Sequence, residues 1–170
     1  YKPTLPEVVR AVDAASAERN MAAPSFNIEI KSEPQLYGTF QPPPDGFAEL
    51  VLREVRSLGI ADRCILQSFD PAVLEAVHVL KPELPLALLV ENAEGLEANI
   101  SKLSFVPNYY SPAFSIVNTR MAAELREKGI GLLVWTVNED ADIFRMLDVG
   151  VSGIITDKPK RAMALIAERQ

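Results

Sequence analysis

The chain has 170 residues, enough for one domain with a real core, and 48% of them are hydrophobic. The net charge of −6 argues against nucleic acid as a partner. No apolar run approaches the roughly 20 residues that a membrane-spanning helix needs. We therefore expect residues 1–170 to form a single globular domain without stable membrane insertion. The one cysteine, Cys64, lies in an apolar run and is expected to be buried.

Helical and extended patterns alternate along the whole chain. Thr4 and Glu7 have the spacing of a capping box, which predicts the start of a first helix. Further helices are expected over 46–58, 71–80, 93–103, 117–128, 139–148 and from 159 to about 167. Strands are expected over 26–31, 63–68, 86–90, part of 104–110, 131–137 and 153–156. Residues 32–45 are too rich in proline for a helix or a central strand, so we expect a long loop.

About six strand–helix units preceded by a leading helix predict an α/β protein with a parallel sheet. The strands are short and apolar, as expected where helices cover both faces or a barrel encloses them. A complete (β/α)8 barrel usually needs roughly 250 residues. The pattern would therefore suit a TIM-type barrel whose first two strands are missing from this chain.

Ligands of parallel α/β folds bind at the carboxyl ends of the strands, and most of the expected strands end in polar residues. These residues are Glu29 and Lys31, 67–70, Glu91 and Asn92, 109–111, 135–138, and Thr156 and Asp157. Side-chain alternation places Asn27, Glu29 and Lys31 on one face of their strand. A metal ion or a phosphate group would satisfy such a group of side chains, whereas a surface Glu–Lys ion pair explains this segment taken alone.

Several of these polar residues also have a simple structural explanation. Asp70 precedes Pro71 and is expected to cap a helix, and Asp157 and Asn138 are expected to do the same. His78 falls inside a helix, where packing or surface exposure is a simpler role than catalysis. The chain has no second histidine, so it cannot supply a two-histidine acid/base pair.

Four segments that occur in a fixed order carry a family resemblance. They are Asn27-Ile28-Glu29-Ile30-Lys31, Ile65-Leu66-Gln67-Ser68-Phe69-Asp70, Trp135-Thr136-Val137-Asn138 and Gly150-Val151-Ser152-Gly153-Ile154-Ile155-Thr156-Asp157-Lys158-Pro159. Together they resemble the glycerophosphodiester phosphodiesterase family, a group of TIM-barrel enzymes. The opening segment, residues 3–8, resembles the segment that follows the second strand of that family, so the resemblance covers nearly the whole chain.

The resemblance implies hydrolysis of a small-molecule glycerophosphodiester to glycerol 3-phosphate and an alcohol, assisted by Ca²⁺ or Mg²⁺. By analogy Glu29 is a metal ligand, Lys31 contacts the phosphate, and Trp135 lines the substrate pocket with Phe69 beside it. A hard cation does require carboxylates, and a phosphodiester anion requires nearby positive charge. The loop 32–45 is expected to form part of the pocket rim. The resemblance suggests a periplasmic or secreted bacterial location but leaves a cytoplasmic one open, and a homo-oligomer is also left open.

The chain lacks the family's His-Arg-Gly, Glu-x-Asp and His-Asp segments, which carry both catalytic histidines and two metal ligands. We expect these segments upstream of Tyr1, so this chain should hold no catalytic residue and should be inactive alone. A different hypothesis is a non-catalytic binding module that keeps the barrel without the acid/base pair. A third is another metal-dependent TIM-barrel enzyme, such as an enolase-type lyase, but only Glu29 and Glu91 would qualify as its acidic ligands.

Overall fold

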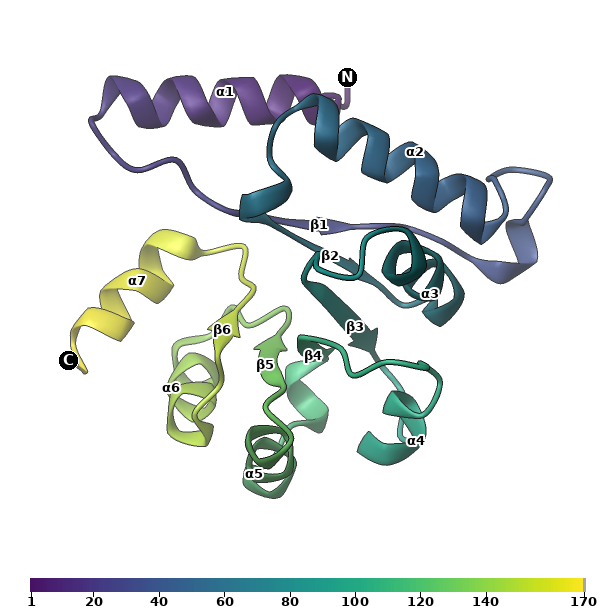
Figure 1. Cartoon of the computed structure of the whole chain (residues 1–170). Helices are drawn as coiled ribbons and strands as arrows, with labels where there is room; N and C mark the ends of the chain where they lie inside the picture. Colours follow the sequence, from purple (N-terminus) through teal and green to yellow (C-terminus); the bar gives the residue numbers. More distant parts are fainter. Residues whose placement is uncertain (170) are drawn as a thin grey trace.

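The computed structural model describes residues 1–169, which form a curled parallel sheet with helices along its outer side (Figure 1). The strands are β1 (Phe26–Glu29), β2 (Cys64–Ser68), β3 (Leu86–Val90), β4 (Tyr109–Pro112), β5 (Gly131–Val134) and β6 (Gly153–Ile154). They lie side by side in sequence order, and each pairs in parallel with the next. This arrangement is a half-barrel, and it confirms the predicted α/β class and parallel sheet.

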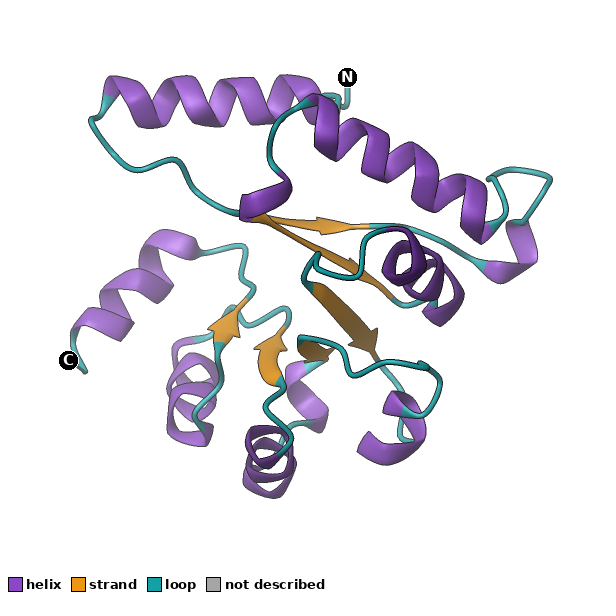
Figure 2. Ribbon diagram, viewed as in Figure 1, coloured by secondary structure: helices purple, strands orange, loops and turns teal. Residues whose placement is uncertain are grey.

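Helices lie on the outer side of the sheet (Figure 2). Successive strands are connected by α2 (Pro44–Ser57), α3 (Pro71–Leu80), α4 (Leu96–Ile100), α5 (Thr119–Glu127) and α6 (Asp140–Val149), while α1 (Leu5–Glu18) precedes β1 and α7 (Pro159–Ala167) follows β6. Short 3-10 turns occupy Pro34–Leu36, Ala61–Arg63 and Phe114–Ile116. Among residues 1–169, every helix is too short or too polar to serve as a membrane span.

Three predicted boundaries are wrong for identifiable reasons. The helix expected over 93–103 shrinks to α4, because Gly95 precedes it with a left-handed φ of 91° and the chain turns after Ile100. The loop expected over 32–45 ends early, because Pro44 fits the first turn of α2. The fourth strand begins only at Tyr109, so Tyr109 and Tyr110 lie at its start and not at its carboxyl end.

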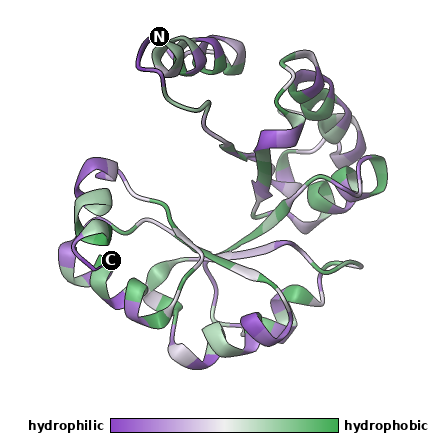
Figure 3. Ribbon diagram, turned by 60° about the vertical axis from the view of Figure 1, so that its left-hand side comes forward, coloured by the Kyte–Doolittle hydropathy of each residue, from purple (hydrophilic) through white to green (hydrophobic). Residues whose placement is uncertain are grey.

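The outer face of the sheet forms the main hydrophobic core. Leu88, Tyr110 and Leu132 are register partners on adjacent strands, and all three are buried. Residues of the covering helices join the same cluster; they include Val73, Leu74, Val77, Leu125, Ile143 and Met146. The helices carry hydrophilic residues elsewhere on their surface, as Figure 3 shows by colour. Burial of this face fixes the register of the sheet.

The inner face of the sheet combines large side chains with glycines on the neighbouring strand. A Cβ atom at Gly131 would lie 2.4 Å from Cδ1 of Tyr109, and one at Gly153 would lie 2.8 Å from Cδ2 of Leu133. The Tyr109 ring and the Leu133 side chain therefore fill the space that a Cβ atom at Gly131 or Gly153 would need. Any residue other than glycine at these two positions would force neighbouring atoms to shift.

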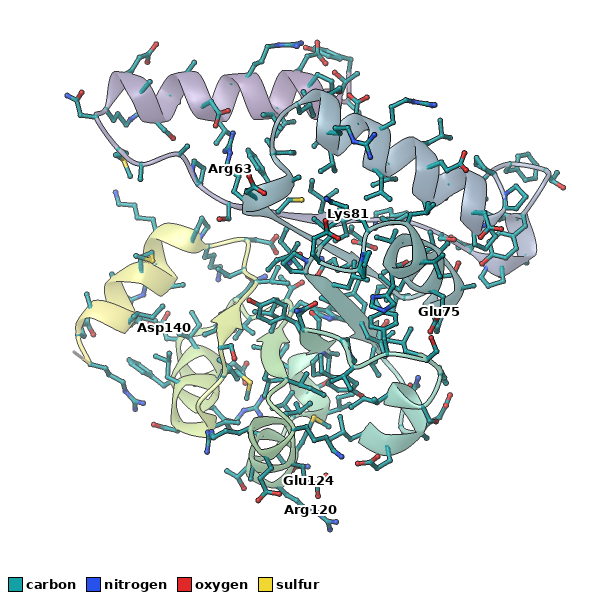
Figure 4. All side chains as sticks on the ribbon, viewed as in Figure 1. Arg63, Glu75, Lys81, Arg120, Glu124 and Asp140 are labelled. Carbon is teal, nitrogen blue, oxygen red and sulfur yellow. The ribbon has the colours of Figure 1, made fainter. Side chains whose placement is uncertain are left out.

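The first helix lies at one end of the molecule (Figure 1), where Val9 joins the hydrophobic core and Arg63, labelled in Figure 4, adds polar contacts. One Arg63 nitrogen lies 2.6 Å from a carboxylate oxygen of Asp13, and another donates to the carbonyl of Pro24 at 2.8 Å. Its guanidinium also lies 5.0 Å from the centre of the Phe26 ring. The predicted capping box is confirmed, because Glu7 accepts the backbone N–H of Thr4 at 2.7 Å, a contact that lowers the pKa of Glu7.

We predict that Gly131→Ala destabilises the protein by roughly 1–3 kcal/mol, because the added methyl group would overlap the Tyr109 ring. Gly46→Ala is the matched control. Gly46 lies in helix α2, and a Cβ atom added there would meet only Pro42, at an ordinary contact distance of 3.6 Å. The substitution should therefore leave the free energy of unfolding unchanged or raise it slightly. Urea unfolding of both variants measures the difference, and equal stabilities would show that the inner face has room beside Gly131.

We also predict that residues 1–170, produced alone, associate with one another or aggregate. Among the described residues, β1 pairs only with β2 and β6 only with β5, so each has an open edge. Unpaired edges, and inner-face side chains such as Tyr109 and Leu133 that are only partly buried, promote association. Size-exclusion chromatography with light scattering measures this, and a monodisperse monomer with cooperative unfolding would contradict an incomplete barrel.

Candidate functional site

A cleft of about 330 Å³ lies at the carboxyl ends of the strands and gathers all four predicted site residues. Its lining consists of Glu29, Lys31, Gln67, Phe69, Leu89, Glu91, Trp135, Thr136 and Ile155. These residues come from the ends of five strands or from the positions just beyond them. The parallel register therefore brings together side chains that are more than a hundred residues apart in sequence, as we predicted from their strand-end positions.

Glu29 and Lys31 form an ion pair at the end of β1. The Nζ atom of Lys31 lies 2.9 Å from Oε1 of Glu29, and the two side chains are 81% and 29% exposed, respectively. Such an exposed pair contributes little to stability. The polar face continues along the strand, where Asn27 donates to the side chain of Gln67 at 3.0 Å. The ammonium group of Lys31 is thus free to turn toward an anion in the cleft.

Two aromatic rings form an apolar wall of the same cleft. Trp135 directly follows β5, and its indole N–H donates to the carbonyl of Ser111 at 2.8 Å. The rings of Phe69 and Trp135 meet edge to face, with centroids 5.5 Å apart and planes at 85°. This is a favourable geometry for an aromatic pair. Because the indole N–H is already bonded to the protein, Trp135 presents carbon surface to the cleft.

The donor atoms of the cleft fit a divalent cation in type but not in number. Glu29 and Glu91 are the two carboxylates that line it. Within residues 1–169 no three His, Cys, Asp or Glu side chains converge on one point. Calcium takes six to eight oxygen ligands and magnesium six, some of which are water. The described residues could therefore supply only part of a coordination shell.

Asp70 has a larger role than the helix cap that the sequence predicts. The cap is confirmed, because Oδ1 accepts the backbone N–H of Ala72 at 3.0 Å. The other oxygen, Oδ2, accepts hydrogen bonds from the hydroxyl groups of Ser32 and Tyr37. Asp70 is only 3% exposed. Burial, together with the bond to Asp70, raises the pKa of Tyr37 to about 12.

The expected caps at Asn138 and Asp157 are wrong. The N-cap residues are Glu139 for α6 and Lys158 for α7, and neither forms a side-chain capping bond. Instead Asn138 joins two loops at the strand ends: its carbonyl oxygen accepts the N–H of Asp157 at 2.9 Å, and its amide donates to the Asp157 carboxylate. Both residues prefer these bonds because the two loops lie side by side after adjacent strands.

His78 and Cys64 take the structural roles that we expected. The ring of His78 stacks on Phe105 with centroids 4.0 Å apart, and it does not line the cleft. Cys64 is buried, and burial raises the pKa of its thiol. These two residues therefore add nothing to the chemistry of the strand ends.

Larger depressions exist, so size does not single out the strand-end cleft. One of about 920 Å³ is lined largely by residues of α2 and α3. Another of about 590 Å³ lies between β1 and helices α1 and α2, and Glu29 and Lys31 line it as well. The strand-end cleft differs because it joins this carboxylate and ammonium group to an aromatic pair from two other strand ends. This combination marks it as the candidate site.

Comparisons with known proteins place the chain in a family. The model of the "Glycerophosphoryl diester phosphodiesterase family" matches residues 1–161. A glycerophosphodiester phosphodiesterase of Caldanaerobacter subterraneus is 28% identical over 144 residues, which cover 82% of this chain and 54% of that protein. A second one, from Bacillus altitudinis, is 28% identical over 170 residues, covering 98% of this chain and 63% of that protein.

Solved structures agree with this assignment. A putative glycerophosphoryl diester phosphodiesterase from Silicibacter pomeroyi superposes with a TM-score of 0.81 at 29% identity, over 98% of this chain and 57% of that one. A phosphodiesterase from Oleispira antarctica shares the fold, with a TM-score of 0.77 at 16% identity, over 97% of this chain and 61% of that one. The predicted TIM-type barrel is confirmed, although the chain spans only between half and two thirds of each of these relatives. The chain belongs to the glycerophosphoryl diester phosphodiesterase family.

Proposed function

We propose that the protein containing this chain hydrolyses glycerophosphodiesters to glycerol 3-phosphate and an alcohol, with Ca²⁺ or Mg²⁺ as a cofactor. Family membership supports this proposal. The observation that carries it is the cleft in which Glu29, Lys31 and the aromatic pair meet. The Oleispira phosphodiesterase, which shares the fold, was solved with its product sn-glycerol-3-phosphate. That molecule combines an anion with a short carbon chain, and the cleft offers a complementary surface for each.

The proposed roles follow from the chemistry of each side chain. Glu29 would be one ligand of the cation, whose charge would stabilise the developing charge on the phosphoryl oxygens. Lys31 would leave Glu29 and bind a phosphate oxygen through its ammonium group. Trp135 and Phe69 would cover the carbon atoms of the glycerol and keep water away from them.

The acid/base groups of this mechanism would have to come from outside the chain. Its one histidine stacks on Phe105, away from the cleft. We propose that the histidines belong to a segment upstream of Tyr1, and that residues 1–170 alone are inactive. The position of His78 also favours the second candidate, a non-catalytic binding module. An upstream His-Arg-Gly and Glu-x-Asp in the gene would decide for the enzyme.

We predict that Glu29→Gln in the full-length protein lowers the hydrolysis of sn-glycero-3-phosphocholine by at least roughly a hundredfold, since loss of even an outer-shell partner of a metal costs 10–100-fold. The activity should also require more added Ca²⁺ or Mg²⁺. Glu33→Gln is the matched control, because this carboxylate lies on the surface and pairs with Gln35. Titration of activity with each cation after chelation measures the effect. Normal metal-dependent activity in Glu29→Gln would refute the assignment.

We predict that Lys31→Met lowers kcat/KM by roughly a hundredfold, because it removes a cationic partner of the charge that builds up on phosphate. Lys158→Met serves as the control, since Lys158 pairs with Glu139 and does not line the cleft. Steady-state kinetics of both variants make the comparison. Equal losses would indicate that overall charge, and not the position of Lys31, controls the rate.

A further inference from the structure

Asp70 bonds to the loop after β1 and to the first turn of α3, and nothing in the proposed mechanism uses this carboxylate. Its neighbour Phe69 lines the cleft, and its partner Ser32 directly follows Lys31. We propose that Asp70, Ser32 and Tyr37, here called the Asp70 brace, are positioning residues that hold Lys31 where it can bind a phosphate group. This inference rests on the proposed role of Lys31.

The side chain of Lys31 needs such support from its backbone. It is 81% exposed, and among residues 1–169 it forms an ion pair with Glu29, only two residues before it in the chain. Nothing in that contact fixes the two residues relative to the rest of the cleft. The next residue, Ser32, is 6% exposed and donates its hydroxyl to Asp70. The backbone from which the Lys31 side chain extends is thus anchored by a buried bond one residue further along the chain.

A second set of bonds ties the same point of the backbone to strand β2. The backbone N–H of Ile30 donates to the carbonyl of Gln67 at 2.8 Å, and the Ser68 hydroxyl donates to the carbonyl of Ile30 at 2.7 Å. The Ser68 hydroxyl also accepts the N–H of Asp70 at 3.1 Å. These bonds therefore link the end of β1 to the residues that precede α3.

Tyr37 extends the brace over the loop between β1 and α2. Its hydroxyl donates to the same Asp70 oxygen as that of Ser32, and Gln41 donates to the Ser32 hydroxyl at 3.2 Å. Without these donors, the Oδ2 atom of the buried Asp70 would be left unsatisfied, and this cost stabilises the observed position of the loop. The loop is thus held by bonds and not by an apolar core, since residues 32–43 contribute no member to the hydrophobic cluster.

The test is the double variant Ser32→Ala/Tyr37→Phe in the full-length protein, which removes both hydroxyl donors and leaves Asp70 and its capping bond in place. Ser104→Ala is the matched control. This variant also deletes a hydroxyl that donates to a carboxylate, here that of Glu75 at 2.7 Å (labelled in Figure 4), and neither residue lines the cleft. Calorimetry with sn-glycerol 3-phosphate measures binding, and hydrogen exchange measures the opening of residues 33–41.

We expect the double variant to bind sn-glycerol 3-phosphate roughly tenfold more weakly, because only a fraction of the molecules would hold Lys31 in the binding position. KM for sn-glycero-3-phosphocholine should rise in parallel while kcat changes less, and exchange in residues 33–41 should accelerate. Ser104→Ala should match the unaltered protein in all three measurements. A thermal melt confirms that each variant is folded at the assay temperature.

Faster exchange with unchanged affinity and KM would overturn the inference, since the brace would then support the loop only. Unchanged exchange would overturn it as well. The proposed function fails separately. If the unaltered protein binds sn-glycerol 3-phosphate but does not hydrolyse the diester, the function is refuted and the brace is still judged by binding. If the unaltered protein hydrolyses the diester without measurable affinity for sn-glycerol 3-phosphate, the function stands and the brace is judged by KM and hydrogen exchange alone.

Discussion

The parallel register of the sheet is the constraint on which the candidate site depends. Burial of Leu88, Tyr110 and Leu132 under the helices fixes which residues of each strand face outward. The alternate residues then face inward, and those at the carboxyl ends meet in one cleft. A slip of one residue in β1 would turn Glu29 toward the helices and an isoleucine into the cleft. The hydrophobic core therefore determines which polar side chains reach the cleft.

The sequence was sufficient for features that depend on local periodicity. Alternating patterns predicted the order of helices and strands, and the two-residue spacing of Glu29 and Lys31 predicted that they share a face. The Asp70–Pro71 pair predicted a helix cap, which was confirmed. The other partners of Asp70 could not be predicted, because Ser32 and Tyr37 lie 38 and 33 residues away and no short-range pattern encodes those contacts.

The same limit explains the wrong predictions at Asn138 and Asp157. Each stands where a capping residue is common, and either side chain could have bonded to its own helix. The tertiary fold offered a better partner, because the loops after β5 and β6 lie side by side and the two side chains satisfy each other. Local propensity is overridden where long-range contacts satisfy the same donors and acceptors. The functional roles of Glu29, Lys31, Phe69 and Trp135 remain predictions, as does the single-domain organisation of residues 1–170.

Trp135 has a consequence that goes beyond its place in the wall of the cleft. It is the only tryptophan of this chain, its N–H is bonded to the Ser111 carbonyl, and its ring meets the edge of Phe69. When the chain is excited at the long-wavelength edge of its ultraviolet absorption, where tyrosine absorbs little, the fluorescence comes from Trp135 alone. That ring lines the same cleft as Glu29 and Lys31. The chain carries an intrinsic optical reporter of whatever enters its cleft, and no chemical label is required to read it.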